Sequence, residues 1–212
     1  MKQKDLLLIF VKHPEAGKTK TRLAAGIGQE NALAIYQKLL DYTCSLARTI
    51  KADVQIWYGN QMPVTDLWSE AGFERYQQVG ASLGDRMLHA FHTGFEQGYG
   101  RILIIGSDCA TLTPEILNQG FLSLGQNQVV IGPARDGGYY LLGMRRLLKQ
   151  LFYNKNWSTE TVLSDTISDL QSANFSYHCL EQLSDVDTKD DLQGTFLEDF
   201  LASRPHPKNP EV

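Results

Sequence analysis

The sequence predicts an α/β fold in which a mostly parallel central sheet is covered by helices on both faces. Short apolar runs alternate along the chain with segments of helical periodicity, an order typical of β-α-β units. The segment 101–105, Arg-Ile-Leu-Ile-Ile, is almost continuously apolar, as expected of a strand buried on both faces of a parallel sheet. Because ligands of such sheets bind at the carboxyl ends of the strands, a site is expected in the loops that follow them.

The first half of the chain is predicted to alternate between strands and helices. Leu6–Val11 is an apolar strand, and apolar residues at helical spacing predict a helix from Gln29 to about Ile50. A strand at Ala52–Tyr58 completes the first β-α-β unit. A further strand at Phe73–Val79 and a helix from about Leu83 to Gln97, ended by glycines, lead to the central strand at 101–105.

The second half begins with a well-marked helix. Thr113 is a hydroxyl cap, Pro114 takes the first helical position and Glu115 adds an acid to the first turn. Ser158 is expected to cap a later helix. The remaining elements are predicted as strands at 128–132, 139–144 and 175–180 and as helices at 158–173 and 188–202.

Length and composition limit the class of protein. The 212 residues predict a single domain at 1–203 and a flexible tail at 204–212 that holds three of the seven prolines. No apolar run reaches the roughly 20 residues of a membrane span, and the first residues lack a signal peptide, so a cytoplasmic protein is expected. The net charge of −4 argues against a nucleic-acid polymer as partner. The three cysteines are far apart and are expected as free thiols.

A basic loop, residues 12–22, follows the first strand. Its cations, Lys12, Lys18, Lys20 and Arg22, are opposed within the loop only by Glu15. They could bind phosphate through charge-assisted hydrogen bonds, and the arginine could contact two oxygens at once. The alternative is a surface loop whose cations are solvated, but the position after a buried strand favours a phosphate site.

The same loop invites comparison with the P-loop, because Gly17-Lys18-Thr19 matches the end of that pattern. Lys12 stands where the pattern requires its first glycine. No helical pattern begins directly after Thr19, whereas a P-loop leads straight into a helix. The sequence therefore disfavours a P-loop NTPase.

Three acid-bearing turns follow predicted strands. Asp108 comes directly after the central strand, and an acid there could hold Mg²⁺ or merely cap a turn. Asp187 lies in Ser184-Asp185-Val186-Asp187-Thr188 and could serve as a metal ligand or a helix cap. Asp136 precedes Gly137 and Gly138, which permit close approach of a ligand or a tight turn.

Two further side chains are candidates for substrate contacts. Arg86 lies near the start of a predicted helix, where it could face an anion together with the helix amides, or pair with Asp85. Trp157 could offer a flat face to a sugar or a base, or could pack in the core.

Together these segments resemble one family. Residues 10–23, 83–87, 106–109, 132–141, 157–159 and 185–192 are similar to small bacterial GT-A-like glycosyltransferases of the nucleotide-diphospho-sugar transferase superfamily. The resemblance implies a Rossmann-like GT-A fold with nucleotide bound over its first half and Mg²⁺ or Mn²⁺ held by Asp108 and Asp187. Ala110 departs from the usual proline. Ser107-Asp108-Cys109 lacks the two-acid motif of many glycosyltransferases, so a metal would need an acid from elsewhere.

The resemblance implies a metal-dependent transferase acting on a nucleotide-activated donor, by glycosyl transfer from a nucleotide sugar to a small-molecule acceptor. One alternative is nucleotidyl transfer from an NTP to a phosphorylated acceptor with release of pyrophosphate. A second is a non-catalytic nucleotide-binding regulatory module. In the catalytic readings Lys20 and Arg22 neutralise charge on the leaving phosphate, and Asp136 orients the acceptor or acts as base. The oligomeric state stays open.

Overall fold

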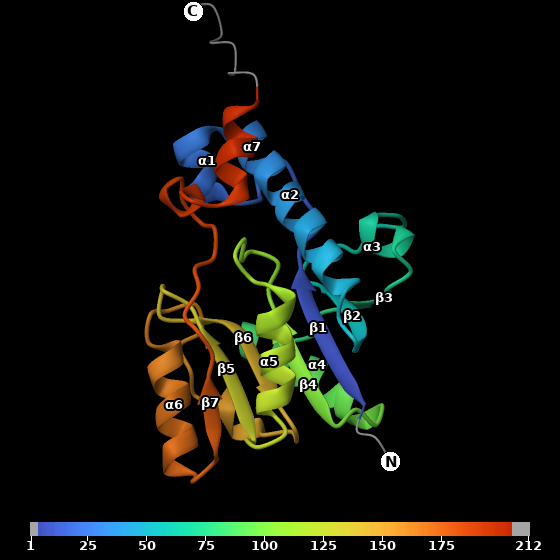
Figure 1. The fold of residues 1–212 in the computed structure, drawn as a ribbon, viewed down its shortest axis with the longest axis vertical. Coiled ribbons are helices and arrows are strands. Elements are labelled where there is room, and N and C mark those ends of the chain that lie inside the picture. Colours follow the sequence, from blue (N-terminus) through green and yellow to red (C-terminus); the bar gives the residue numbers. More distant parts are fainter. Residues whose placement is uncertain (1–3, 205–212) are drawn as a thin grey trace, which may run out of the picture.

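The computed structural model describes residues 4–204 as helices packed on one seven-stranded sheet (Figure 1). The strands are β1 Asp5–Val11, β2 Asp53–Tyr58, β3 Glu74–Gln77, β4 Arg101–Ile105, β5 Val129–Pro133, β6 Tyr139–Met144 and β7 Tyr177–Cys179. Their order is β3-β2-β1-β4-β6-β5-β7, and only β6 runs antiparallel to its neighbours β4 and β5. The predicted mostly parallel sheet is confirmed.

Helices cover both faces of this sheet. They are α1 Thr21–Ile27, α2 Gln29–Ala47, α3 Leu67–Glu70, α4 Leu83–Glu96, α5 Pro114–Ser123, α6 Val162–Ser172 and α7 Phe196–Ala202, with 3-10 turns η1 Lys149–Phe152 and η2 Asp190–Leu192. Strand β1 shows the two layers directly, because its side chains alternate between faces. Leu7 and Ile9 pack with α2 and α5, whereas Leu6 and Leu8 pack with α4 and α6.

The helix α1 corrects one expectation. No helix was predicted directly after Thr19, yet α1 begins at Thr21. Its periodicity is too short to recognise, since Leu23 is its only buried residue. Gly28, with φ of 84°, separates it from α2, whose predicted start at Gln29 is confirmed. The P-loop remains disfavoured, because Lys12 still stands at its first glycine position.

Two other helix boundaries also differ from expectation. Ser158 does not cap α6, because it adopts a φ of 65° and the helix begins later, after Thr161. The closing helix, expected from 188, is divided into η2 and α7. Gly194, with φ of 72°, lies between them, and Thr195 caps α7 by accepting a hydrogen bond from the Leu197 backbone.

The C-terminal tail, the cysteines and the absence of a membrane span were also predicted from the sequence. The expected tail lies outside the described residues except for Arg204, whose Nε–H donates to Asn31 Oδ1 at 2.9 Å. All three cysteines are free thiols, as expected. Within residues 4–204, none of the helices combines the length and the apolar character needed to cross a bilayer.

Candidate active site

A cleft of about 630 Å³ opens where the carboxyl ends of β1 and β4 meet. We call it the β1–β4 cleft. Seven residues predicted to bind phosphate or metal line it: Lys12, Lys18, Lys20, Arg22, Arg86, Asp108 and Asp187. The basic loop and the two metal-ligand candidates, distant in the sequence, thus share one cavity. Its volume lies within the range of roughly 300–1,000 Å³ typical of small-molecule sites.

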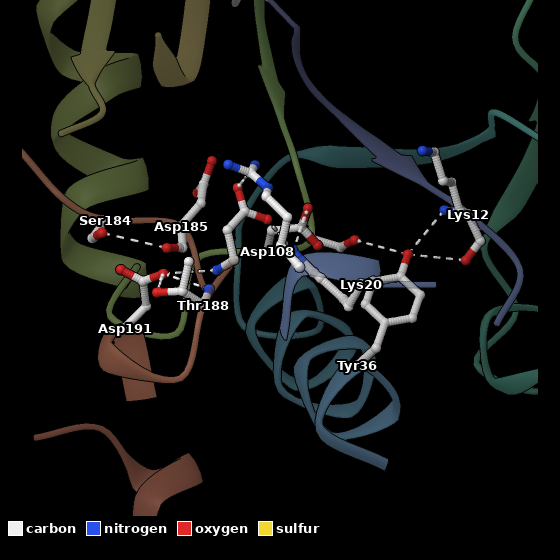
Figure 2. Close-up of polar contacts among 11 residues, drawn as sticks. Lys12, Lys20, Tyr36, Asp108, Ser184, Asp185, Thr188 and Asp191 are labelled. Atoms are coloured by element: carbon white, nitrogen blue, oxygen red, sulfur yellow. Dashed lines mark hydrogen bonds and ion pairs between the residues drawn. The ribbon is translucent and has the colours of Figure 1, made fainter. Parts of the chain in front are cut away.

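The start of the basic loop is fixed by Tyr36 of α2. The Tyr36 hydroxyl accepts the Lys12 N–H at 3.0 Å and donates to the Lys12 carbonyl at 3.0 Å (Figure 2). The same oxygen lies 3.4 Å from Ser107 Oγ, next to Asp108. Burial, reinforced by the Asp108 charge, raises the pKa of Tyr36 to about 12, so its hydroxyl stays protonated. We call this pair of hydrogen bonds between Tyr36 and the Lys12 backbone the clamp. Helical spacing predicted that Tyr36 lies in the core, but it did not predict the clamp.

The middle of the loop forms a tight turn around Glu15. The Lys18 and Thr19 amides both donate to the Glu15 carbonyl at 3.1 Å, and the Glu15 amide donates to Thr19 Oγ1 at 2.9 Å. Asn60, after β2, donates to the Glu15 carboxylate and to the His13 carbonyl. Lys18 pairs with Glu15 at 2.8 Å, and its side chain is 79% exposed. This turn ends just before Lys20.

Lys20 makes the central contact of the cleft. Its Nζ lies 3.0 Å from Asp108 Oδ2 and 3.1 Å from Asp187 Oδ1, and its side chain is only 7% exposed (Figure 2). Arg22 Nη2 binds the other oxygen of Asp187 at 2.6 Å. Burial lowers the pKa of Lys20, but attraction to Asp108 and Asp187 more than offsets this, so the net shift is upward. Lys20 is therefore an ammonium.

Backbone hydrogen bonds bring the two aspartates together. The Val186 N–H donates to the Asp108 carbonyl at 2.9 Å, which ties the segment after β7 to the end of β4. Asp191 of η2 then fixes the next turn, because its Oδ2 accepts the Asp187 amide, the Thr188 amide and the Thr188 hydroxyl (Figure 2). Asp191 belongs to the motif that carried the resemblance, but its supporting role was not predicted.

A further carboxylate, Asp185, also escaped prediction. Burial first, and then the negative charge of Asp108, raises the pKa of Asp185 to about 7, while the Lys20 charge acts in the opposite direction. Asp136 also raises it, which places that residue in the same electrostatic environment. The turn Ser184–Thr188 had been noted as acidic, but Asp185 was not singled out within it.

The carboxylates at the cleft fit a divalent cation. Among residues 4–204, the buried Asp108 Oδ1 has no hydrogen-bond partner, while Asp108 Oδ2 and Asp187 Oδ1 face one common point, which the Lys20 ammonium occupies. Mg²⁺ is commonly bound by one or two carboxylates together with substrate phosphate and water. No group of three or more His, Cys, Asp or Glu side chains between residues 4 and 204 is arranged to hold a metal ion. A metal would therefore depend on Asp108, Asp187 and the substrate.

Asp136, Gly137 and Gly138 do not line the β1–β4 cleft. Asp136 Oδ1 accepts the Gly138 N–H at 2.9 Å, so this carboxylate stabilises its own turn. Gly137 has φ of 87°, and a Cβ there would collide with the Glu160 backbone. The glycine pair thus meets the needs of the turn and of close packing against the segment before α6.

The remaining two candidates differ in position. Arg86 lines the cleft from the first turn of α4, where its Nε–H donates to the Gly80 carbonyl at 3.1 Å. Asp85 instead forms a capping box with Ser82. Trp157 packs over Gly84 and stacks on Phe152, with ring centroids 6.4 Å apart, and does not line the cleft.

Residues 41–159 match the model of a family described as "Uncharacterized protein conserved in bacteria (DUF2064)". The chain belongs to this family. No curated protein matches it. A solved structure from Desulfovibrio desulfuricans G20, described as a "putative nucleotide-diphospho-sugar transferase", is 28% identical over 94% of each chain, with a TM-score of 0.84. The predicted resemblance to GT-A-like nucleotide-diphospho-sugar transferases is confirmed, and so is the GT-A-like fold.

More distant structures share the fold alone. The 4-diphosphocytidyl-2C-methyl-D-erythritol synthase of Anaerococcus prevotii DSM 20548 is 11% identical, with a TM-score of 0.62 over 94% of this chain and 96% of that chain. The glucosyl-3-phosphoglycerate synthase of Mycobacterium tuberculosis, solved with Mn²⁺, UDP and glucosyl-3-phosphoglycerate, is 11% identical, with a TM-score of 0.56 over 95% of this chain and 78% of that one. Both synthases therefore share the fold of this chain.

Proposed function

We propose that the protein is a metal-dependent transferase that moves a glycosyl group from a nucleotide-diphospho-sugar to a small-molecule acceptor. The observation that carries this proposal is the meeting of the basic loop with Asp108 and Asp187 in the β1–β4 cleft. The likeness to a described nucleotide-diphospho-sugar transferase across 94% of both chains supports the donor class.

The cleft can neutralise a diphosphate. Lys18 and Arg22 reach it from the basic loop, and Arg86 reaches it from the first turn of α4. Arg22 is 72% exposed although it pairs with Asp187, so its guanidinium can also contact phosphate oxygens. Such contacts hold the donor and grow stronger as charge develops on the leaving diphosphate.

Asp108 and Asp187 are the residues that would hold Mg²⁺ or Mn²⁺. A bound divalent ion would supply charge stabilisation at the phosphate oxygens. Asp108 Oδ2 and Asp187 Oδ1 face the common point that the Lys20 ammonium fills, and Asp187 is held in place by Val186 and Asp191 on either side. The synthase from Mycobacterium tuberculosis, which shares the fold, was solved with Mn²⁺ in one complex and with Mg²⁺ in another.

In the transfer itself, an acceptor hydroxyl oxygen forms a bond to the anomeric carbon of the sugar. The bond between that carbon and the diphosphate oxygen breaks, and its electron pair leaves with the nucleoside diphosphate. Lys20 and Arg22 stabilise the charge on this leaving group. Asp136 lies outside the lining of the cleft and has one oxygen in the turn with Gly138, so an acceptor that extends beyond that lining would give its hydroxyl proton to Asp136 Oδ2.

The density of positive charge in the cleft favours a second candidate reaction, nucleotidyl transfer from an NTP. Lys12, Lys18, Lys20, Arg22 and Arg86 all line one cleft, which suits a triphosphate as well as a diphosphate. In this reaction a phosphate oxygen of the acceptor bonds to the α-phosphorus of an NTP, and pyrophosphate leaves with the electron pair of the broken bond. Both candidates use the same phosphate-binding residues.

A product assay separates the candidates. The purified protein is incubated with a panel of nucleotide sugars or NTPs and small-molecule acceptors, with and without Mn²⁺, and the products are identified by mass. Free nucleoside diphosphate with a glycosylated acceptor supports glycosyl transfer, whereas pyrophosphate supports nucleotidyl transfer. Nucleotide binding without either product would contradict both reactions and leave a regulatory module.

A further inference from the structure

The cation position of the β1–β4 cleft is already occupied by a side chain. The Lys20 ammonium lies within 3.1 Å of one oxygen of Asp108 and one of Asp187, the two oxygens on which a bridging metal would depend. At 7% exposure the lysine is more buried than either carboxylate, which are 38% and 32% exposed. The ammonium is thus enclosed between its partners.

A divalent cation cannot simply join this arrangement. Two cations on the same pair of oxygens would lie a few ångströms apart, and the attraction of each to the carboxylates would be offset by mutual repulsion. A metal ion entering the cleft must therefore displace Lys20 Nζ. That displacement breaks two charge-assisted contacts of a largely buried group, so metal binding to the free protein is weakened.

The donor provides a new partner for the displaced lysine. Lys20 and its neighbours Lys18 and Arg22 line the cleft proposed to take the donor phosphates. Lys20 also has a backbone φ of 51°, which L-residues rarely adopt. It stands at the start of α1, where it makes no side-chain capping hydrogen bond. The two carboxylate contacts help to hold it there, and phosphate oxygens could replace them.

We propose that Lys20 fills the cation position in the free protein and yields it only when donor phosphates arrive, so that metal and nucleotide bind cooperatively. This inference rests on the proposed function, because it deepens the account of the same cleft. Linkage makes the effect reciprocal: the factor by which nucleotide strengthens metal binding equals the factor by which metal strengthens nucleotide binding.

The test is the affinity of the free protein for Mn²⁺ alone, measured by titration calorimetry or by the electron paramagnetic resonance of free Mn²⁺. Lys20→Met is expected to bind Mn²⁺ about tenfold more tightly than wild type, because the ion no longer competes with the ammonium. Lys20→Arg keeps a cation between the carboxylates and is expected to resemble wild type.

Lys18→Met is the matched control. It removes the same charge from the same loop, but Lys18 pairs with Glu15 and contacts neither aspartate. Long-range charge is screened in salt, so its Mn²⁺ affinity is expected to stay within about threefold of wild type. An unchanged affinity in Lys20→Met, or an equal gain in Lys18→Met, would overturn the proposal.

Two safeguards keep the outcome interpretable. If circular dichroism shows that Lys20→Met does not fold, Lys20→Gln replaces it, since its amide can still hydrogen-bond to carboxylates while carrying no charge. If a Lys20 variant binds Mn²⁺ more tightly but wild type forms no transfer product, the proposed reaction is refuted and the competition between Lys20 and the metal is not. If wild type transfers the group but the Lys20 variants bind Mn²⁺ no more tightly than wild type, only the proposed competition between Lys20 and the metal is refuted.

Discussion

The Val186 N–H donates to the Asp108 carbonyl at 2.9 Å, and this contact joins the end of the central strand β4 to the segment that follows β7. It sets the spacing of Asp108 and Asp187, whose oxygens then face the same lysine. Two acids from distant parts of the sequence thereby belong to one cleft. The site depends on this cross-connection as much as on the side chains themselves.

Asp108→Asn is expected to reduce metal-dependent transfer by about 100-fold or more in kcat/KM, because a neutral amide replaces a carboxylate at the cation position. The product assay with Mn²⁺ measures the change. Asp199→Asn changes an exposed residue of α7, and this control is expected to keep wild-type activity. Full metal-dependent activity in Asp108→Asn would show that the metal assignment is wrong.

Tyr36→Phe tests the clamp at the start of the basic loop. The hydroxyl satisfies both the N–H and the carbonyl of Lys12, so its loss should lower the free energy of unfolding by about 1–3 kcal/mol. Urea denaturation measures this difference. Tyr177→Phe removes a hydroxyl whose partner is the exposed Gln171 side chain and should cost less than about 0.5 kcal/mol. Equal costs would refute the clamp.

The turn beside Asp136 gives a prediction about backbone and packing together. Gly137→Ala should destabilise the fold by about 3 kcal/mol or more, since the positive φ is strained and the new Cβ meets the Glu160 backbone. Gly98→Ala has a φ of 86° with no atom near the new Cβ, so it should cost only about 1–2 kcal/mol of backbone strain. Thermal unfolding of both variants separates the cost of backbone strain, which both share, from the cost of the clash with Glu160, which only Gly137→Ala has. A similar loss in each would mean that packing against Glu160 is unimportant.

The capping box that begins α4 should make stability depend on acid pH. Hydrogen bonds from the Ser82 backbone and hydroxyl hold the pKa of Asp85 below its ordinary value. A depressed folded-state pKa stabilises the fold above the unfolded value, and this contribution is lost as pH falls through the folded value. The stability difference between wild type and Asp85→Asn should therefore be largest above about pH 5 and shrink toward about pH 3. Urea titrations at several pH values measure it, and a difference that grows on acidification would contradict the assignment.

The sequence predicts those parts of the fold whose signal is local. The apolar run 101–105 and the Thr113-Pro114 start correspond directly to β4 and α5. Helix α1 escaped because a seven-residue helix with one buried side chain has almost no periodicity. Gly194 divides the closing helix with a φ of 72°, and its N–H donates to the Glu198 carboxylate.

For the site, residue type and position after a strand were enough to select Lys20, Arg22, Asp108 and Asp187. Position alone did not reveal that the lysine would lie between the two aspartates, because that contact depends on the pairing of Val186 with Asp108. Asp185 was missed for a related reason. Its raised pKa comes from burial and from neighbours brought together by folding.

The central claim is that one phosphate-bearing donor is held by the basic loop and the two aspartates through a shared cation. The most direct measurement is a crystal structure of the protein soaked with Mn²⁺ and the nucleotide sugar that binds best in the panel. The account predicts anomalous Mn²⁺ density within about 2.0–2.3 Å of carboxylate oxygens of Asp108 and Asp187, with the diphosphate against Arg22. Nucleotide bound outside the β1–β4 cleft, or Mn²⁺ bound away from both aspartates, would contradict it.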